Sequence, residues 1–281
     1  MQHKKLEDII RDVKASGKKV VTLITHDGQC HADDVYCTAL LQILFRKAGL
    51  KTKVLRTRDE SFAASFEKTN DNYVCYDVFG GILDHHNTME LSKEGFIRPL
   101  AAIGRLWRFG KEEFIKYLGI DEQSWKGVDS KFIAFIDQTD CLGSSVKVNP
   151  CTYLFNHYRD STQDSSESWK RSLGKALIDW SYILQTEENV SKLRPVFNKF
   201  PVREINGKKF KVMSNYVPPV GNIVDIDGLI WATDKGLRVR LLKQNKLDKN
   251  VGLKEDDIIF QNDQWMIEVK SVENIYQLKF K

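Results

Sequence analysis

Cysteine is scarce in this sequence, and long apolar runs are missing from it. The 281 residues include five cysteines, an odd number without CxxC spacing, which argues against a disulfide framework and against a zinc knuckle. A reducing cytoplasm is therefore the expected environment. No apolar run reaches the roughly 20 residues that a transmembrane helix needs. The charged N-terminus does not read as a signal peptide, so the sequence predicts a cytoplasmic protein without a membrane segment.

Charge of one sign is also limited, because 43 basic and 38 acidic residues leave a formal net charge of +5. This small excess permits an anionic substrate but does not select one class of partner. A hydrophobic content of 42% with 29% charged residues is typical of a folded globular protein. Histidine is rare, with six residues, yet four of them lie in two short clusters. Neighbouring imidazoles are not needed by a strand or a core, but they are common in metal sites.

Alternating strand and helix patterns dominate the first half of the chain. Apolar, β-rich runs predict strands at 18–26, 51–59 and 72–80, and apolar residues at helical spacing predict helices at 32–49 and 60–68. This order predicts an α/β fold with a largely parallel sheet flanked by helices. In such sheets, ligands bind beyond the carboxyl ends of the strands.

The pattern changes after Pro201, where short β-patterned pieces separated by Gly, Pro and Asn predict a small antiparallel β-rich region. We expect three parts: an α/β domain that carries the chemistry, a helical connector, and a β-rich C-terminal region that shapes substrate access. Their expected bounds are 1–150, 151–199 and 200–281.

The stretch THDGQCHADD (25–34) joins the first predicted strand to a predicted helix. His26, His31, Asp33 and Asp34 offer nitrogen and oxygen donors within nine residues, on a loop that can fold around an ion. Acidic residues at a helix N-terminus are also stabilised by its dipole, by about 0.3–1 kcal/mol. That second interpretation explains the aspartates but not both histidines, and the two stay open.

A second cluster begins at Asp77, which follows the apolar run YVCY, and continues with Asp84, His85 and His86. A carboxylate at the end of a buried strand is costly unless it is paired or coordinated. The alternatives are a turn residue before paired glycines for Asp77, and a surface turn for the triplet.

A third motif, FIDQTD (135–140), places Asp137 directly after an apolar run and Asp140 three residues later. A helix-terminal aspartate is the alternative interpretation, and the choice between Asp137 and Asp140 as a late ligand stays open. Mixed His and Asp ligation suits Mn²⁺, Fe²⁺ or Zn²⁺ better than Ca²⁺. The donors outnumber those of one catalytic ion with an open position. Two ions about 3.5–4 Å apart, bridged by one carboxylate, would use them all.

The order of these motifs resembles that of the DHH phosphoesterase superfamily, and within it the MYG-type (melanocyte proliferating gene) family of metal-dependent nucleases. THDGQCHADD is similar to that family's THNGxFHxDE, and LRTRDE (55–60) is similar to its RTRDP. AAIGRLWRFGKEEF (101–114) is similar to SSAGLVYKHFGKE, and FIDQTD to xxDAIDNG. The resemblance covers residues 18–145 and implies a DHH-like metal-binding catalytic domain there.

Carried over residue by residue, the resemblance implies that Asp77 bridges two metal ions and that His86 faces the scissile phosphate. It makes both residues catalytic candidates. Arg56 and Arg58 are the nearest guanidinium groups for the other substrate oxygens. The implied metal ligands are His26, His31, Asp33, Asp77, His85 and Asp137.

The sequence also departs from the family pattern. The spacer between Asp77 and Asp84 is shorter, and Ala101 and Ala102 stand where the family has two serines. The GGGH motif of the common DHH-associated substrate domain does not occur in 200–281. These departures bear on the substrate more than on the metal chemistry.

The resemblance implies a binuclear-metal phosphoesterase that hydrolyses phosphodiester bonds, as an exonuclease acting on RNA or oligonucleotides. Two divalent ions would be its cofactors, Mn²⁺ first and Mg²⁺ second. One alternative is a hydrolase of phosphoanhydrides or small nucleotides. Another is a metal-containing module that binds nucleotides or nucleic acid without turnover. The sequence argues against this loss of turnover, because each metal-ligating position of the motifs holds a histidine or an aspartate.

Overall fold

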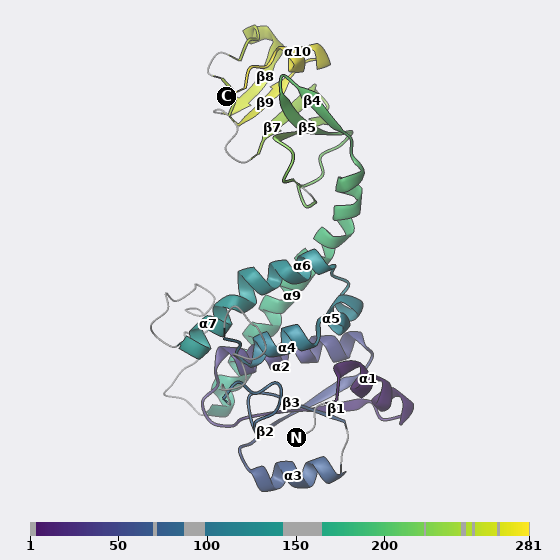
Figure 1. Cartoon of the computed structure of the whole chain (residues 1–281), viewed down its shortest axis with the longest axis vertical. Coiled ribbons are helices and arrows are strands. Elements are labelled where there is room, and N and C mark those ends of the chain that lie inside the picture. The colour runs from purple at the N-terminus through teal and green to yellow at the C-terminus, as the bar shows by residue number, and fades with distance from the viewer. Residues whose placement is uncertain are drawn as a thin grey trace. The chain divides into compact units, whose positions relative to one another are not determined.

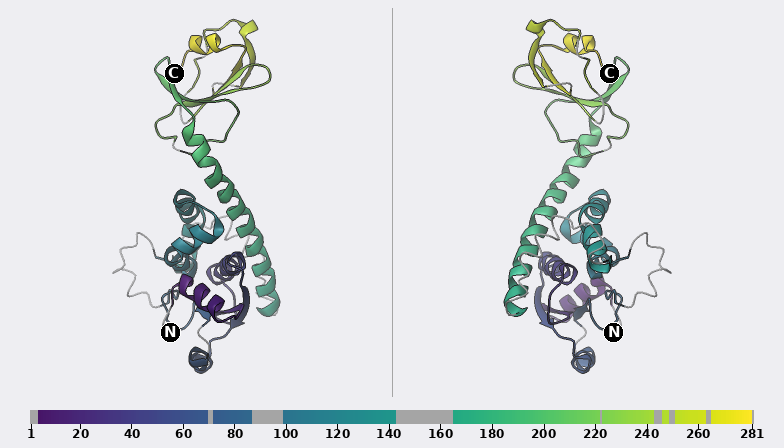
Figure 2. Two further views of the ribbon diagram at one scale, coloured as in Figure 1. Left: turned by 90° about the vertical axis from the view of Figure 1, so that its right-hand side faces the viewer. Right: turned by 90° about the vertical axis from the view of Figure 1, so that its left-hand side faces the viewer.

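The computed structural model contains two compact units, Met1–Glu188 and Asn189–Lys281, whose elements are labelled in Figure 1 and seen from two further sides in Figure 2. Of the expected connector, 165–199 forms one helix, and 151–164 lies outside the described residues. The three-part division therefore stays a prediction. The structure describes residues 4–69, 72–86, 99–142, 165–221, 223–242, 246–248, 251–262 and 265–280.

Three parallel strands form the sheet of the N-terminal unit, in the order β2-β1-β3. The strands are β1 (Val20–Thr25), β2 (Lys51–Arg56) and β3 (Tyr73–Cys75). This sheet confirms the predicted parallel α/β fold. Thr25 pairs with Arg56, and Ile24 pairs with Cys75. Because the strands are parallel and in this register, the residues that follow each strand emerge at one edge of the sheet.

Helices cover mainly one face of this sheet. Apolar residues of α1, α2 and α4 pack with Val21 and Leu23 of β1 in the main core. A smaller cluster around Ile24 and Cys75 lies on the other face, and Figure 1 shows α3 on the side away from α2. No helix among the described residues is long and apolar enough to cross a membrane. The helical segments are α1 (Leu6–Ala15), α2 (Ala32–Lys47), α3 (Glu60–Thr69), α4 (Ala102–Phe109), α5 (Lys111–Leu118), α6 (Glu122–Val128), the π-helix η2 (Asp129–Ile133), α7 (Ala134–Leu142) and α9 (Ser165–Lys199).

Strand β3 ends earlier than the strand predicted at 72–80, and this part of the prediction is wrong. Asp77 and Phe79 have φ angles of +56° and +64°, a left-handed conformation that an extended strand does not contain. The backbone N–H of Asp77 donates to the carbonyl oxygen of Leu83 at 3.1 Å. The chain therefore turns back directly after β3, which brings residues 84–86 to the end of the sheet.

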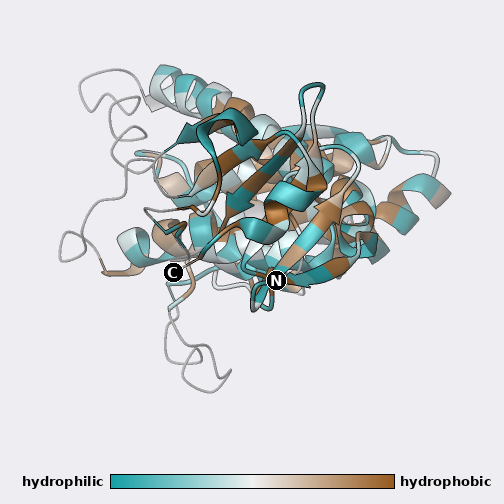
Figure 3. Ribbon diagram, turned by 90° about the horizontal axis from the view of Figure 1, so that it is seen from above, coloured by the Kyte–Doolittle hydropathy of each residue, from teal (hydrophilic) through white to brown (hydrophobic). Residues whose placement is uncertain are grey.

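The C-terminal unit contains a six-stranded sheet in the order β4-β5-β6-β7-β9-β8. A purely antiparallel sheet was expected, and that expectation is wrong for β5 and β6, which are parallel because a long connection rather than a hairpin joins them. Figure 3 shows hydrophobic and hydrophilic residues alternating along the strands. The elements are β4 (Val202–Ile205), β5 (Lys208–Met213), β6 (Gly228–Ala232), β7 (Leu237–Leu241), the 3₁₀-helix η4 (Glu255–Asp257), β8 (Ile258–Asn262), β9 (Met266–Val269) and α10 (Val272–Gln277).

The two faces of this sheet differ. One face packs Phe210, Ile230 and Ile267 in a core that also holds Ile275 of α10. The other face is covered over β5 and β6 by the end of α9 and by the connection between those strands.

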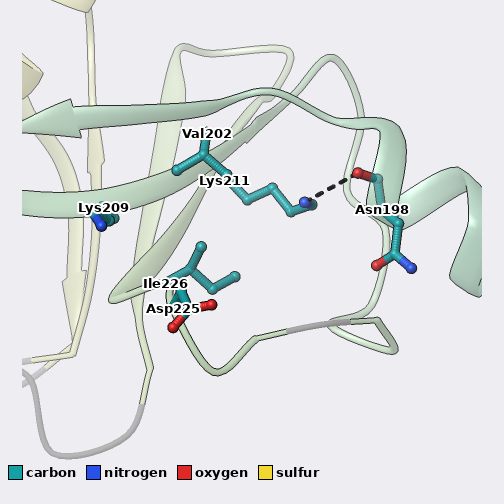
Figure 4. A pocket seen from close by; sticks show the side chains of 6 residues that line it. All are labelled: Asn198, Val202, Lys209, Lys211, Asp225 and Ile226. Carbon is teal, nitrogen blue, oxygen red and sulfur yellow. Dashed lines mark hydrogen bonds between the residues drawn. The ribbon is translucent and has the colours of Figure 1, made fainter. Parts of the chain in front are cut away.

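A buried lysine caps the C-terminal end of α9, where this helix packs on the sheet. Lys211 is 5% exposed, its ammonium donates to the carbonyl oxygen of Asn198 at 3.4 Å, and it lies 5.0 Å from the ring centroid of Phe197. Figure 4 shows the Lys211 side chain directed to the last turn of the helix. A cation there complements the negative end of the helix dipole, so this buried charge has a structural explanation.

Candidate metal centre

Histidine and aspartate side chains from four parts of the N-terminal unit meet at the carboxyl edge of its sheet. They come from the loop after β1, the first turn of α2, the loop after β3 and the helix α7. Most of them are buried. Their donor atoms form three groups, each within 4.8 Å: Asp77, Asp84, His85 and His86; His26, His31 and Asp77; His31, Asp33 and Asp140.

Asp77 lies at the centre of this cluster. Its Oδ2 is 3.1 Å from Nε2 of His26, and its Oδ1 is 3.1 Å from Nδ1 of His85. The side chain is therefore placed between two imidazoles, one on each carboxylate oxygen. The strained φ of Asp77 sets this direction, since a residue at positive φ points its side chain differently from one in the strand.

The two ring nitrogens of His26 face different groups. Nδ1 lies 2.8 Å from the carbonyl oxygen of Asp27 and 3.1 Å from Nη2 of Arg58. Nε2 faces carboxylate oxygens of Asp34 at 3.3 Å and Asp77 at 3.1 Å. Burial acts to lower the pKa of His26, but its contacts with Asp77 and Asp34 outweigh this and raise that pKa. A lone pair directed at two carboxylates is unfavourable unless a cation or a proton lies between them.

His85 has acids at both of its ring nitrogens. Nε2 is 3.0 Å from Oδ2 of Asp140, and Nδ1 is 3.1 Å from Asp77 and 3.6 Å from Oδ2 of Asp33. Only a protonated imidazole can donate to acids on both sides, so without a metal ion these acids stabilise the charged ring.

The cluster leaves many buried polar atoms without a hydrogen bond, even though their neighbours are close. An unsatisfied buried polar group costs about 1–3 kcal/mol, and a charged one costs more. Cations could coordinate most of these atoms, because nitrogen and oxygen atoms with free lone pairs are metal ligands. The atoms are Nε2 of His26, Oδ1 of Asp33, Oδ2 of Asp34, both carboxylate oxygens of Asp77, and Nδ1 of His85.

The ionisation of the cluster follows from burial and crowding. Burial, reinforced by the charge of Asp77, raises the pKa of Asp33 well above its usual value. Burial raises the pKa of Asp34 to about 7, although the nearby His26 opposes the rise. Burial acts to lower the pKa of His85, but its contacts with Asp140 and Asp77 outweigh this and raise that pKa to about 11. Without cations, the cluster therefore holds protons near its acids.

Asp77 itself stays ionised. Burial acts to raise the pKa of Asp77, but its contacts with His26 and His85 outweigh this and lower that pKa to about 2. This residue is 1% exposed and keeps its charge at every physiological pH. A buried carboxylate that stays charged between two imidazoles is suited to bridge two cations.

The donor set fits divalent metal ions. It mixes imidazole nitrogens with carboxylate oxygens, a combination that Mn²⁺, Fe²⁺ and Zn²⁺ accept. Asp77 belongs to two of the three donor groups, and His31 also belongs to two. A shared carboxylate is the arrangement that two neighbouring ions require.

His86 lies at the rim of the cluster rather than inside it. Its side chain is 61% exposed, whereas that of His85 is 12% exposed, and the two rings stack at 4.3 Å between centroids. Nδ1 of His86 is 2.7 Å from Oδ1 of Asp84, and that carboxylate also accepts the backbone N–H groups of Gly80 and His86. Asp84 therefore orients the His86 ring, a role that the sequence did not predict.

The two late aspartates occupy different places. Asp137 is fully buried, its Oδ1 accepts the backbone N–H of Ala101 at 3.0 Å, and a side chain at Gly104 would collide with it. Asp140 lies one turn further along α7, in contact with His85. Among the described residues, the donor groups contain Asp140 and do not contain Asp137.

The two arginines also differ. Arg56 donates to the carbonyl oxygens of His26 and Gly28, and its guanidinium lies 4.2 Å from the ring centroid of Trp169. It holds the loop that carries His26. Arg58 is 61% exposed at its side chain and lies beside the same loop, with Nη2 at 3.1 Å from Nδ1 of His26. Arg58 is thus the freer of the two to meet a substrate.

Comparison with known proteins gives low similarity to solved structures. Exonuclease RecJ bound to manganese is 9% identical, with a TM-score of 0.36, over 98% of this chain and 92% of that one. A pGpG-specific phosphodiesterase, PggH, from Vibrio cholerae is 9% identical, with a TM-score of 0.34, over 90% and 94%. Similarities this low say nothing of activity. No curated protein sequence matches the chain.

A family of sequences gives a clearer match, and it confirms the resemblance drawn from the motifs. The matched segment contains every residue of the cluster described above. It is residues 22–198 that match the family MYG1_exonuc, described as uncharacterised protein family UPF0160, and the chain belongs to this family.

Proposed function

We propose that the chain is a metal-dependent phosphoesterase with a binuclear centre, which hydrolyses phosphodiester bonds as an exonuclease of RNA or oligonucleotides. One observation carries the proposal: buried nitrogen and oxygen atoms without hydrogen bonds converge around the charged carboxylate of Asp77. Such a cluster destabilises the fold because buried polar atoms lack partners, and binding of divalent cations would offset this destabilisation.

The proposed ligands divide into two sets that share Asp77. His26 faces its Oδ2 and shares a donor group with His31, whereas His85 faces its Oδ1 and lies 3.6 Å from Oδ2 of Asp33. The late ligand in this proposal is Asp140, because it contacts His85, while Asp137 supports the start of α4. Two divalent ions, Mn²⁺ or Mg²⁺, would supply Lewis acidity and lower the pKa of a water molecule.

His86 is proposed to act on the substrate. With its Nδ1 held by Asp84, the other ring nitrogen, Nε2, is free to exchange a proton with a phosphate or a leaving oxygen. The exposed ring is accessible to such a group, whereas the ring of His85 is not.

Arg58 is proposed to neutralise the remaining charge of the phosphate. It lies on the loop after β2, next to His26, and its exposed guanidinium can make paired hydrogen bonds to phosphate oxygens. Arg56 is proposed to act indirectly, by fixing the loop between β1 and α2.

Three substrates separate the proposal from its alternatives. Purified protein with Mn²⁺ would be incubated with end-labelled RNA, with a dinucleotide and with pyrophosphate. The proposal expects release of mononucleotides from RNA. Hydrolysis of pyrophosphate alone would favour a phosphoanhydride hydrolase, and binding without turnover of any of the three would favour a module that only binds. An Asp77→Asn variant controls for contaminating nucleases.

A further inference from the structure

The C-terminal sheet carries an open patch of aromatic and guanidinium groups on the half that α9 does not cover. Arg240 of β7 pairs across the sheet with Leu229 and with Met266, so its side chain shares a face with theirs. The guanidinium of Arg240 lies 5.6 Å from the ring centroid of Trp265. We call this patch the Arg240 face, and it consists of Tyr216, Arg238, Arg240, Phe260 and Trp265.

The aromatic rings of this face are exposed. Trp265 is 37% exposed, and Tyr216 and Phe260 are each 43% exposed. Tyr216 rests on Trp231 at 4.9 Å between centroids and has its hydroxyl 3.5 Å from Nη1 of Arg240. Flat rings held in place by buried neighbours keep their orientation, and this lowers the entropic cost of stacking another ring on them.

The two arginines of the face are not equivalent. Arg238 is paired with Glu268, which neutralises it. Arg240 has no carboxylate partner within the described part of the chain, and its neighbours are Trp265 and Tyr216. One cation set between two exposed rings is therefore left available for an anionic group.

The other side of the sheet offers no such combination among the described residues. There the apolar residues of the strands are buried with Ile275 of α10 and with Leu278, which follows this helix. Tyr276 of α10 is 57% exposed but has no cation within stacking distance among the described residues. It supplies a matched control.

We propose that the Arg240 face binds single-stranded nucleic acid, with bases stacked on Trp265 and Tyr216 and a phosphate held by Arg240. This chemistry fits the face because every base presents a ring for stacking while the backbone presents negative charge. A duplex hides its bases, so it is a poorer ligand. The inference deepens the proposed function by naming single-stranded nucleic acid as the substrate class, and it rests on that proposal only for this link.

Binding would be measured with the full-length chain in EDTA, so that no metal-dependent cleavage occurs. The probe is a fluorescein-labelled oligouridylate, followed by anisotropy, with a duplex of the same length as comparison. Loss of one stacked base weakens binding by roughly 5- to 150-fold, so Trp265→Ala and Tyr216→Ala should each fall in this range. Trp265→Phe should retain most of the affinity, and Tyr276→Ala should match the wild type.

A second assay keeps this inference apart from the proposed function. Hydrolysis of bis(p-nitrophenyl) phosphate with Mn²⁺ needs only the metal centre and should be the same in all of these variants. If hydrolysis fails but the binding pattern holds, the proposed function is wrong and the inference stands. If the wild type does not bind the oligouridylate, or if Trp265→Ala and Tyr216→Ala bind it as well as Tyr276→Ala does, the inference is overturned.

Discussion

Each unit of the chain buries an acid that faces charged or ionisable nitrogen, and the comparison shows what separates a site from a structural pair. Glu268 in the C-terminal sheet is 2% exposed, and Asp77 in the N-terminal unit is 1% exposed. Glu268 accepts hydrogen bonds from Thr233 at 2.6 Å and from Nε of Arg238 at 2.9 Å. Neither carboxylate oxygen of Asp77 has a hydrogen bond.

The difference also appears in the ionisation of the two regions. Burial acts to raise the pKa of Glu268, but its contacts with Thr233 and Arg238 outweigh this and hold it below the usual value. The pKa of Asp33 is raised well above its usual value, because burial and like charges add together there. Burial of an acid alone therefore does not indicate a functional site. Burial of an acid whose oxygens have no hydrogen bonds does indicate one.

The largest effect is expected from removing the central carboxylate. Asp77→Asn should abolish Mn²⁺-dependent hydrolysis, by more than roughly 10³-fold, since loss of a single electrostatic donor already costs about 10²–10³ in rate. Asp140→Asn should reduce turnover less, because Asp140 would hold only one ion in the proposed centre. Glu268→Gln, a buried acid of the other unit, should leave turnover of a small diester unchanged. Equal losses at Asp77 and Asp140 would mean that the bridging role is misassigned.

Alanine variants of the two adjacent histidines should lose turnover for different reasons. His85→Ala removes a buried donor, so metal occupancy should fall and excess Mn²⁺ should partly restore turnover. His86→Ala should keep its metal and lose rate by roughly 10²–10⁴-fold, the range of a positioned proton-transfer group. Titration of Mn²⁺ into each variant while following diester cleavage measures this. A shared response to metal would contradict the division between the buried and the exposed ring.

Metal affinity should rise with pH. Without metal, contacts with Asp140 and Asp77 outweigh burial and raise the pKa of His85 to about 11, and burial raises the pKa of Asp33 well above its usual value, so both groups hold a proton more readily than usual. A cation needs the bare nitrogen and oxygen, so its binding releases protons, and the affinity should rise about tenfold per pH unit for each proton released. Dissociation constants for Mn²⁺ at several pH values between 6 and 8 check this. An affinity that does not change with pH would contradict it.

The smallest effect is a contrast in stability without metal. Burial raises the pKa of Asp33, so the charged form of this residue destabilises the fold. The protonated form stabilises the fold at low pH, and this contribution is lost as the pH rises through the folded-state pKa. Asp33→Asn removes the charge and keeps the shape of the side chain. In EDTA at neutral pH, this variant should melt a few degrees higher, since about 1 kcal/mol shifts Tm by about 2–4 °C.

Glu268→Gln provides the opposite half of the contrast, because it leaves Arg238 without its partner, and it should melt lower. Thermal melts followed by circular dichroism compare the two variants. Destabilisation of both to the same degree would remove the distinction between the regions.

The sequence predicted the parallel sheet and the residues at its edge, because apolar runs ending in His26 and Asp77 have a clear meaning in an α/β fold. It did not predict that β3 ends at Cys75, because no feature of the neighbouring sequence indicates that Asp77 takes a left-handed conformation. The orienting role of Asp84 was missed for a related reason. It depends on a loop whose shape only the folded chain defines.

Other parts of the site depend on contacts far apart in the sequence. The choice between Asp137 and Asp140 rests on which turn of α7 meets His85, a packing fact that spacing alone does not contain. The role of Arg56 rests on Trp169, more than a hundred residues away. The parallel pairing of β5 with β6 likewise depends on the path of a connection.

The most direct test of the central claim is a count of metal ions per chain. Protein reconstituted with Mn²⁺ and freed of unbound metal would be analysed for manganese against its concentration. The account predicts close to two ions per chain, and a clear loss in Asp77→Asn, because that carboxylate is the donor placed between both groups. One ion or none in the wild-type protein would contradict the binuclear centre.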